Sequence, residues 1–161
     1  GLRGLGNGWL LPAGPLRERP SRLASVNAVV IRGENKTGLS IKHHAMRLTP
    51  GAFINVRDRT QRMEARAFQG KRVLALAGIG NPQQFFDTLA GMGVTHTPRA
   101  FPDHHAYTPN DLNAEGCDAI VMTEKDAVKC QAFASEKCWA LAVQAEADEQ
   151  LTCDVMQSIS K

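Results

Sequence analysis

The chain of 161 residues has no apolar run long enough to cross a bilayer. Its longest apolar stretches, such as 73–79, fall far short of the ~20 residues that a transmembrane helix requires. The first sixteen residues have no basic start leading into an apolar core, so we expect no signal peptide. With 43% hydrophobic and 22% charged residues, the composition is that of a soluble globular protein.

Paired cysteine motifs are also absent. The four cysteines show neither a C-x-x-C pair nor a finger-like spacing with histidine; they are Cys117, Cys130, Cys138 and Cys153. This pattern favours free thiols over disulfides or a zinc site.

Acidic residues are scarce in the first half of the chain. Residues 1–72 carry 14 Lys/Arg against 4 Asp/Glu, whereas residues 73–161 carry 5 against 12. The basic half favours an anionic surface or phosphate groups as a partner, although a solvated basic face fits equally well. No aromatic RNA-recognition motif or basic helix accompanies the charge, so we expect no nucleic-acid partner.

Local patterns predict an α/β fold. Glycine and proline make residues 1–25 loop-like, and a short strand is expected at 26–31. A strand, a Thr-Pro-Gly turn and a second strand are expected over 45–56, as a hairpin-like connector. Residues 57–68 are predicted as a short helix or an ordered loop.

The second half alternates strands with helices. Strands are expected at 73–77, 95–101, 119–123 and 139–143. Helices are expected at 82–92 with Asn81 as N-cap, after Thr108, at 124–134 and at 145–159. This order predicts a small parallel sheet with helices on its faces.

Two glycine-containing segments fall short of phosphate-binding motifs. Residues 33–37 lack the glycine that precedes the lysine of a P-loop. Residues 78–83 lack the third glycine of a dinucleotide fingerprint and are better interpreted as a tight strand-to-helix turn, although such a turn also presents N–H groups to an anion.

Asp103-His104-His105 follows a predicted strand and has three interpretations. In the first, the histidines are hydrogen-bonded in a loop and have a structural role. In the second, they bind a metal, as in the phosphoesterases named after Asp-His-His. In the third, an imidazole performs acid–base chemistry beside a carboxylate. The upstream aspartates and histidine of those phosphoesterases have no matching motif here.

A second polar segment, 123–126, directly follows another predicted strand. Parallel strands bring their carboxyl ends to one sheet edge, so this segment is expected beside the Asp-His-His loop. Its alternative is structural: Thr123 caps a helix whose first acids complement the helix dipole.

Four extended motifs, taken together, resemble one family. They are Gly6-Asn-Gly-x-Leu-Leu-Pro-Ala-Gly-Pro-Leu-Arg-Glu18, Ala77-Gly-Ile-Gly-Asn-Pro-x-x-Phe-Phe86, Phe101-Pro-Asp-His-His-x-Tyr107 and Thr123-Glu-Lys-Asp-Ala-Val-Lys129. In this order they resemble tetraacyldisaccharide 4'-kinase, the lipid A 4'-kinase of Gram-negative bacteria. The resemblance implies a P-loop protein that transfers the γ-phosphate of ATP, with Mg²⁺, to the 4'-hydroxyl of a lipid-linked disaccharide.

The resemblance also implies how the chain is organised. Residues 1–35 correspond to the tail of an N-terminal P-loop unit, 36–69 to a β-hairpin-like linker and 70–161 to a C-terminal Rossmann-like unit. The Walker A loop itself is absent from the chain, so the chain alone is expected to be inactive without the missing N-terminal P-loop unit. The implied location is the cytoplasmic face of the bacterial inner membrane, with an anionic membrane surface as a peripheral partner.

The resemblance assigns roles to particular residues. His104 and its neighbour Asp103 are the expected catalytic residues, and in the complete enzyme the His104 imidazole is expected to pair with an aspartate of the N-terminal unit and help it accept the hydroxyl proton. Arg17, Thr123, Lys125 and His105 are expected contacts to substrate or phosphate, because guanidinium and ammonium groups suit oxyanions. No metal ligand is expected. The alternatives are a non-catalytic α/β binding module and, less favoured, a phosphoesterase built on Asp-His-His.

Overall fold

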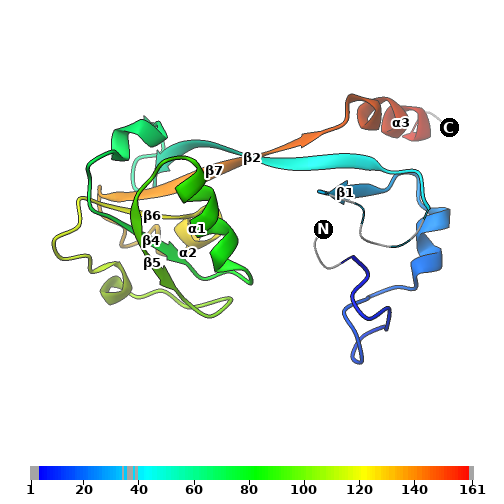
Figure 1. Ribbon diagram of the computed structural model, residues 1–161, viewed down its shortest axis with the longest axis horizontal. Coiled ribbons are helices and arrows are strands. Elements are labelled where there is room, and N and C mark those ends of the chain that lie inside the picture. Colours follow the sequence, from blue (N-terminus) through cyan, green and yellow to red (C-terminus); the bar gives the residue numbers. More distant parts are fainter. Residues whose placement is uncertain (1–3, 34, 36–37, 39, 160–161) are drawn as a thin grey trace. The chain divides into compact units, whose positions relative to one another are not determined.

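A computed structural model describes residues 4–33, 35, 38 and 40–159. The strands are β1 (Val30–Arg32), β2 (His44–Asn55), β3 (Arg62–Met63), β4 (Val73–Ala77), β5 (His96–Ala100), β6 (Ala119–Thr123) and β7 (Cys138–Ala147). The α-helices are α1 (Pro82–Gly91), α2 (Glu124–Cys130) and α3 (Glu149–Ile159), and the 3-10 helices are η1 (Pro20–Ser25), η2 (Ala65–Phe68) and η3 (Pro109–Leu112). The chain divides into two compact units, residues 1–49 with 145–161 and residues 50–144 (Figure 1).

The strands join in the order β1-β2-β7-β6-β4-β5, with β3 paired to β2. β4 is the centre of a parallel arrangement in the second unit, because it pairs with β5 on one side and β6 on the other, while β6 pairs parallel with β7. The predicted α/β class with a parallel sheet is therefore confirmed. It follows that β4, β5 and β6 end at the same edge of the sheet.

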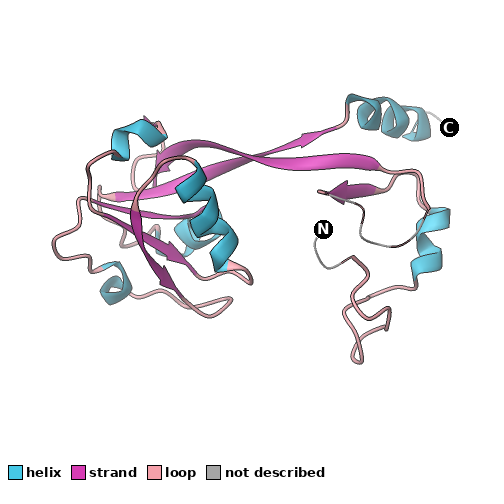
Figure 2. Ribbon diagram, viewed as in Figure 1, coloured by secondary structure: helices cyan, strands magenta, loops and turns pink. Residues whose placement is uncertain are grey.

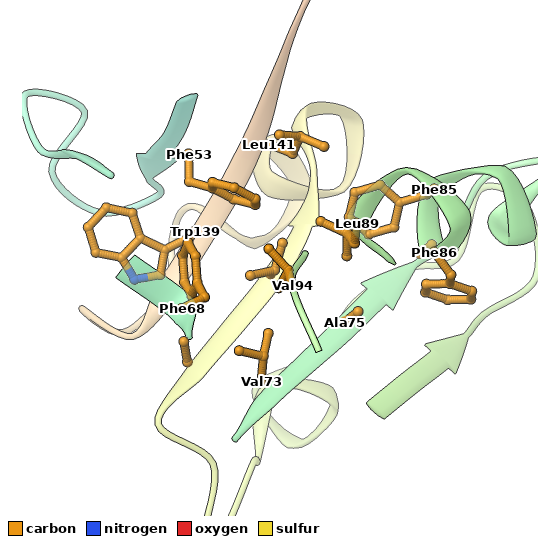
Figure 3. Close-up of a cluster of buried hydrophobic side chains, with 13 residues drawn as sticks. Phe53, Phe68, Val73, Ala75, Phe85, Phe86, Leu89, Val94, Trp139 and Leu141 are labelled. Atoms are coloured by element: carbon orange, nitrogen blue, oxygen red, sulfur yellow. The ribbon is translucent and has the colours of Figure 1, made fainter. Parts of the chain in front are cut away.

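Alternate residues of these strands face two separate apolar cores. On one face, Val73, Ala75 and Ala77 of β4 pack with Phe85 and Leu89 of α1 (Figure 3). This core continues through Phe53, Phe68 and Trp139, whose rings meet edge to face. The pleat of a strand sends successive side chains to opposite faces, so α1 covers one side of the sheet.

The other core lies under α2. Leu74 and Leu76 of β4 and Met122 of β6 pack there with Ala127 and Cys130 of α2. The fully apolar run 73–77 is therefore a strand covered on both faces.

Local capping explains where α1 begins and ends. The Asn81 side chain accepts a hydrogen bond from Gln84 N at 3.4 Å, and Pro82 occupies the first turn. At the other end, Gly93 adopts a φ of 76°, which favours glycine. The predicted N-cap is confirmed, and the helix ends one residue before the predicted Met92.

The predicted hairpin over 45–56 is wrong. β2 runs without interruption from His44 to Asn55, through Thr49-Pro50-Gly51 (Figure 2). A Pro-Gly turn of that kind needs a positive φ at the glycine, and Gly51 is not among the residues that have one. Instead, β2 pairs with β7, and a Cβ added at Gly51 would lie 3.5 Å from the carbonyl oxygen of Ala142 in that strand, so this segment is extended beside a neighbouring strand.

The chain reverses after β2 rather than within it. The buried Asn55 amide donates to Glu136 O at 2.7 Å, and its Oδ1 accepts from the backbone N–H groups of Arg57 and Asp58. These bonds set up the turn that leads into β3. The basic segment 57–68, predicted as a helix or loop, therefore contains β3 and the 3-10 helix η2.

Several other boundaries differ from the prediction. β7 extends to Ala147, and α3 begins at Glu149 rather than at residue 145. α2 ends at Cys130, four residues early, and the strand predicted at 26–31 is Val30–Arg32. The prediction for β6 is matched residue for residue.

The first unit contains a buried histidine. His44 Nε2 lies 3.2 Å from Asp154 of α3, and its Nδ1 lies 3.8 Å from Asp148. Lys42 donates to the same Asp154 carboxylate at 3.0 Å. These contacts attach α3 to the start of β2. Across the described parts of the chain, no helix has the length and apolar character needed to span a membrane.

Candidate functional site

Three loops converge where β4, β5 and β6 end, all within the second unit. They are the Gly78–Gly80 turn before α1, the Phe101–Thr108 segment after β5, and the Thr123–Asp126 start of α2. Phe101 N donates to Ala77 O at 2.8 Å, which ties the second loop to the end of β4. Open parallel sheets present their reactive side chains at this edge.

The Asp103-His104-His105 segment presents His104 to solvent. The His104 side chain is 91% exposed, and its Nε2 lies 3.8 Å from Asp103 Oδ2. His104 has a φ of 62°, and its backbone N–H donates to Asp103 Oδ1 at 3.0 Å. The left-handed backbone conformation is energetically costly for a histidine, so it persists only where the surrounding loop imposes it. The backbone of this loop therefore sets the direction in which the His104 side chain leaves the chain.

His105 points the other way, into the protein. Its ring stacks on Phe101 at 4.4 Å, and its Nε2 lies 3.3 Å from Asp111 Oδ2. The Asp111 carboxylate also accepts from Thr108 N, and this backbone bond is the main cause that lowers its pKa, with His105 adding to the shift. His105 is held as a structural neighbour of His104 rather than as a second exposed imidazole.

Tyr107 closes the loop against the β4 turn. Its ring meets His105 edge to face at 4.9 Å, and its hydroxyl is buried, without a hydrogen-bond partner of good geometry among the described residues. Burial first, and then the nearby Asp126 carboxylate, raise the pKa of the Tyr107 phenol above its usual range. The phenol therefore stays protonated at neutral pH.

Asp126 is fully buried beneath the three loops. Its Oδ2 accepts hydrogen bonds from Gly78 N at 3.1 Å and from Thr123 Oγ1 at 2.7 Å. On the other oxygen, Lys129 Nζ lies 3.4 Å from Oδ1. The carboxylate thus connects the β4 turn to the start of α2.

The other predicted site residues lie at different places. Thr123 is half-buried and caps α2, with its Oγ1 accepting from Asp126 N at 3.2 Å. Lys125 is exposed on the first turn of α2. Arg17 is exposed in the first unit, so the unit that carries His104 does not itself contain it.

Two residues of this edge were missed by sequence reasoning. Tyr107 was part of a motif without an assigned role, and Asp126 was expected at the sheet edge beside the Asp-His-His loop, or as a charge at a helix start, but without a role of its own. The signal for Asp126 was its position three residues after Thr123, but its bond to Gly78 spans 48 residues and no local pattern predicts it.

The arrangement suits proton transfer more than metal binding. An exposed imidazole beside a carboxylate is a pair of groups that enzymes use for acid–base chemistry. Among residues 4–33, 35, 38 and 40–159, no group of three or more His, Cys, Asp or Glu is placed to hold a metal ion.

A family model described as tetraacyldisaccharide-1-P 4'-kinase (LpxK) matches residues 1–160. A tetraacyldisaccharide 4'-kinase of Chromobacterium violaceum is 49% identical over 154 residues, which cover 90% of this chain and 45% of the relative. One from Methylobacillus flagellatus is 44% identical over 161 residues, covering 100% and 47% respectively. One from Pseudomonas aeruginosa is 49% identical over 145 residues, covering 89% and 42%.

A crystal structure of LpxK from Aquifex aeolicus in complex with ATP has a similar fold. The TM-score is 0.71 at 22% identity, over 94% of this chain and 48% of that chain. The chain spans under half the length of each of these relatives.

Proposed function

Because the chain belongs to the tetraacyldisaccharide-1-phosphate 4'-kinase family, we propose that it is the C-terminal part of such a kinase. The complete protein transfers the γ-phosphate of ATP to the 4'-hydroxyl of a tetraacyldisaccharide 1-phosphate, the lipid A precursor. The observation that carries this proposal is the exposed His104 beside Asp103, at the sheet edge where α/β proteins bind substrates.

His104 is proposed to act on the proton of the attacking hydroxyl. Phosphoryl transfer depends on positioning and on charge stabilisation, and removal of the hydroxyl proton completes the step. An imidazole held near a carboxylate is suited to share that proton. The carboxylate beside it is that of Asp103, whose Oδ2 lies 3.8 Å from His104 Nε2.

The remaining predicted site residues are proposed to bind anionic groups of the substrates or to support the residues that do. Arg17 has the geometry to bind a phosphate through two parallel hydrogen bonds. Lys125 and Thr123, at the start of α2, are proposed to contact a nucleotide or sugar phosphate, with His105 supporting the loop beside them. Mg²⁺ and the phosphate cradle of the Walker A loop are assigned to the N-terminal P-loop unit of the complete kinase, since the sequence contains no Walker A motif and the described residues contain no group of three or more metal-binding side chains.

The proposed organisation and location follow the resemblance. Residues 1–35 complete the P-loop unit, 36–69 link the units, and 70–161 form the C-terminal unit. A substrate with four acyl chains is held in a bilayer, so the kinase is proposed to work at the cytoplasmic face of the inner membrane. The 14 Lys/Arg of residues 1–72 suit the anionic surface found there.

Labelled phosphate transfer from [γ-³²P]ATP to the tetraacyldisaccharide 1-phosphate tests the proposal. The 161-residue chain is compared with the complete kinase that contains it. Transfer by the complete protein alone is expected, because the phosphate cradle and metal site lie outside this chain. An inactive complete protein would instead favour the non-catalytic binding module, and transfer by the chain alone would contradict the proposed division of the site.

A further inference from the structure

Asp126 is buried at a free-energy cost that contacts within its own helix offset only in part. Among the described residues it is the only acidic side chain that is buried, with 0% of its surface exposed. Removing a carboxylate from water is expensive unless hydrogen bonds and a neighbouring cation compensate. Two of its partners belong to its own helix, the N-cap Thr123 at Oδ2 and Lys129 near Oδ1, whereas the third, the backbone N–H of Gly78, belongs to the turn after β4.

Helix capping accounts for the bond to Thr123 but not for the bond to Gly78. An acid three residues after the N-cap normally accepts from the N-cap backbone N–H. Asp111 does this in η3, where its carboxylate accepts from Thr108 N at 2.7 Å. Asp126 occupies the same position after Thr123, yet its Oδ2 accepts from the N–H of Gly78, a residue of another strand's loop. The carboxylate is therefore committed to holding two loops together.

The Gly78–Gly80 turn that Asp126 holds is also the surface on which the histidine loop rests. A Cβ added at Gly78 would lie 2.8 Å from the Tyr107 hydroxyl and 3.3 Å from Asp126 Oδ1. A Cβ added at Gly80 would lie 3.4 Å from Asp103 Oδ2. The segment from Asp103 to Tyr107 therefore contacts the turn at both of its ends.

His104 has little else to fix its position. Its side chain is 91% exposed and has Asp103 as its one charged neighbour among the described residues, at 3.8 Å. The place of its imidazole depends on the backbone between Asp103 and Tyr107, and hence on the turn beneath. A displacement of about 1 Å in a catalytic group lowers rates by as much as about 100-fold.

We propose that Asp126 is a positioning residue, which fixes the Gly78–Gly80 turn and through it the loop that carries His104. This inference rests on the proposed function, in which His104 takes part in phosphoryl transfer. Because the Asp126 side chain is fully buried, we assign it no contact with substrate.

The first test follows the surroundings of the two histidine side chains by NMR and does not depend on an activity assay. The ¹H–¹³C signals of the His104 and His105 imidazoles, and their pH titrations, are recorded by NMR in the 161-residue chain. Asp126→Asn keeps the size of the side chain and removes its charge. We expect both imidazole signals to move, while the signal of the exposed His43 in the first unit stays in place.

Asp118→Asn is the matched control. Asp118 also bridges two segments, because it accepts from Arg72 N at 2.8 Å and pairs with the Arg72 guanidinium at 3.2 Å. It precedes β6 rather than following it, so its loss leaves the imidazole signals unchanged. A folded Asp126→Asn chain with unshifted His104 and His105 signals would overturn the proposal.

A second pair of variants keeps the proposal testable if Asp126→Asn unfolds the chain. Gly78→Ala leaves the carboxylate intact and places a methyl group against the Tyr107 hydroxyl. Gly91→Ala adds the same methyl group where nothing lies within 4 Å. Moved imidazole signals in Gly78→Ala, and unmoved ones in Gly91→Ala, support the proposal; no difference between the two contradicts it.

The activity arm separates this inference from the proposed function. In the complete kinase, Asp126→Asn is expected to lower kcat on the order of 10- to 100-fold while the KM for ATP changes less than about twofold. A change in ATP KM alone would contradict a role in positioning His104. If the NMR signals move but His104→Ala retains the full rate, the loop contact stands and its link to phosphoryl transfer is overturned.

Discussion

At the residue scale, the site is built from contacts between loops rather than from one local motif. Asp126, Gly78 and Tyr107 come from three different strand ends, and their contacts decide where the Asp103-His104 pair lies. The sequence alone predicted that this pair is a candidate for acid–base chemistry, because few side-chain types can perform it. The bond from Asp126 to Gly78 was not, since it joins residues 48 positions apart.

Replacing Tyr107 by phenylalanine tests whether its hydroxyl contributes to the stability of the folded protein. The hydroxyl is buried and has no partner of good geometry among the described residues, so its loss removes little stabilisation. The free energy of unfolding is expected to change by less than about 1 kcal/mol, measured by urea denaturation. A loss of about 2 kcal/mol or more would instead mean that the hydroxyl donates to Asp126.

The buried Cys130 thiol is expected to make the folded protein less stable at alkaline pH. Burial, with added effects of Cys138 and Asp126, raises the pKa of the Cys130 thiol to about 12. An unfolded thiol ionises near pH 8.5, so above that pH the unfolded chain releases a proton that the folded chain keeps. The free energy of unfolding therefore falls as pH rises from about 8.5 towards 12, and this contribution is fully present at neutral pH.

Urea denaturation at about pH 7.5 and about pH 10 measures this effect. Cys130→Ala is expected to show a smaller loss of stability between the two pH values than the unmodified chain. Cys153→Ala is the control, because Cys153 is exposed. Equal losses in Cys130→Ala and the unmodified chain would contradict the assignment.

At the scale of elements, strand boundaries were predicted correctly where the local sequence determines them and wrongly where pairing with a distant strand does. The strands at 73–77 and 119–123 were predicted with correct ends because they are apolar runs bounded by turn and cap residues. β2 was mispredicted because Thr49-Pro50-Gly51 reads locally as a turn, whereas pairing with β7 keeps it extended. β7 was predicted too short because its last five residues are exposed and lack an apolar run.

The contact of η2 with the sheet is expected to contribute strongly to stability. Phe68 of η2 is 1% exposed and lies between the rings of Phe53 at 4.7 Å and Trp139 at 6.3 Å. Phe68→Ala is expected to lower the free energy of unfolding by about 3–5 kcal/mol in urea denaturation. Val128→Ala on α2, where the side chain is 70% exposed, should change it by no more than about 0.5 kcal/mol. Similar values for the two variants would contradict the packing described.

At the scale of the whole molecule, one compact unit carries the complete Asp-His-His loop together with its support. The contacts of Asp103, His105, Tyr107 and Asp126 all fall within residues 50–144. The chain nevertheless spans under half the length of its curated relatives. This is why we assign the phosphate cradle to the remainder of the kinase and a proton-handling group to this chain.

The most direct test of that assignment is the kcat of the complete kinase carrying His104→Ala. Phosphate transfer from ATP to the tetraacyldisaccharide 1-phosphate is measured beside the unmodified enzyme and His43→Ala, which removes an exposed histidine of the first unit. We predict that His104→Ala lowers kcat by about 100-fold or more, as expected for loss of a proton-transfer group, while His43→Ala leaves it unchanged. A His104→Ala enzyme with the full rate would contradict the central claim that this loop belongs to the kinase site.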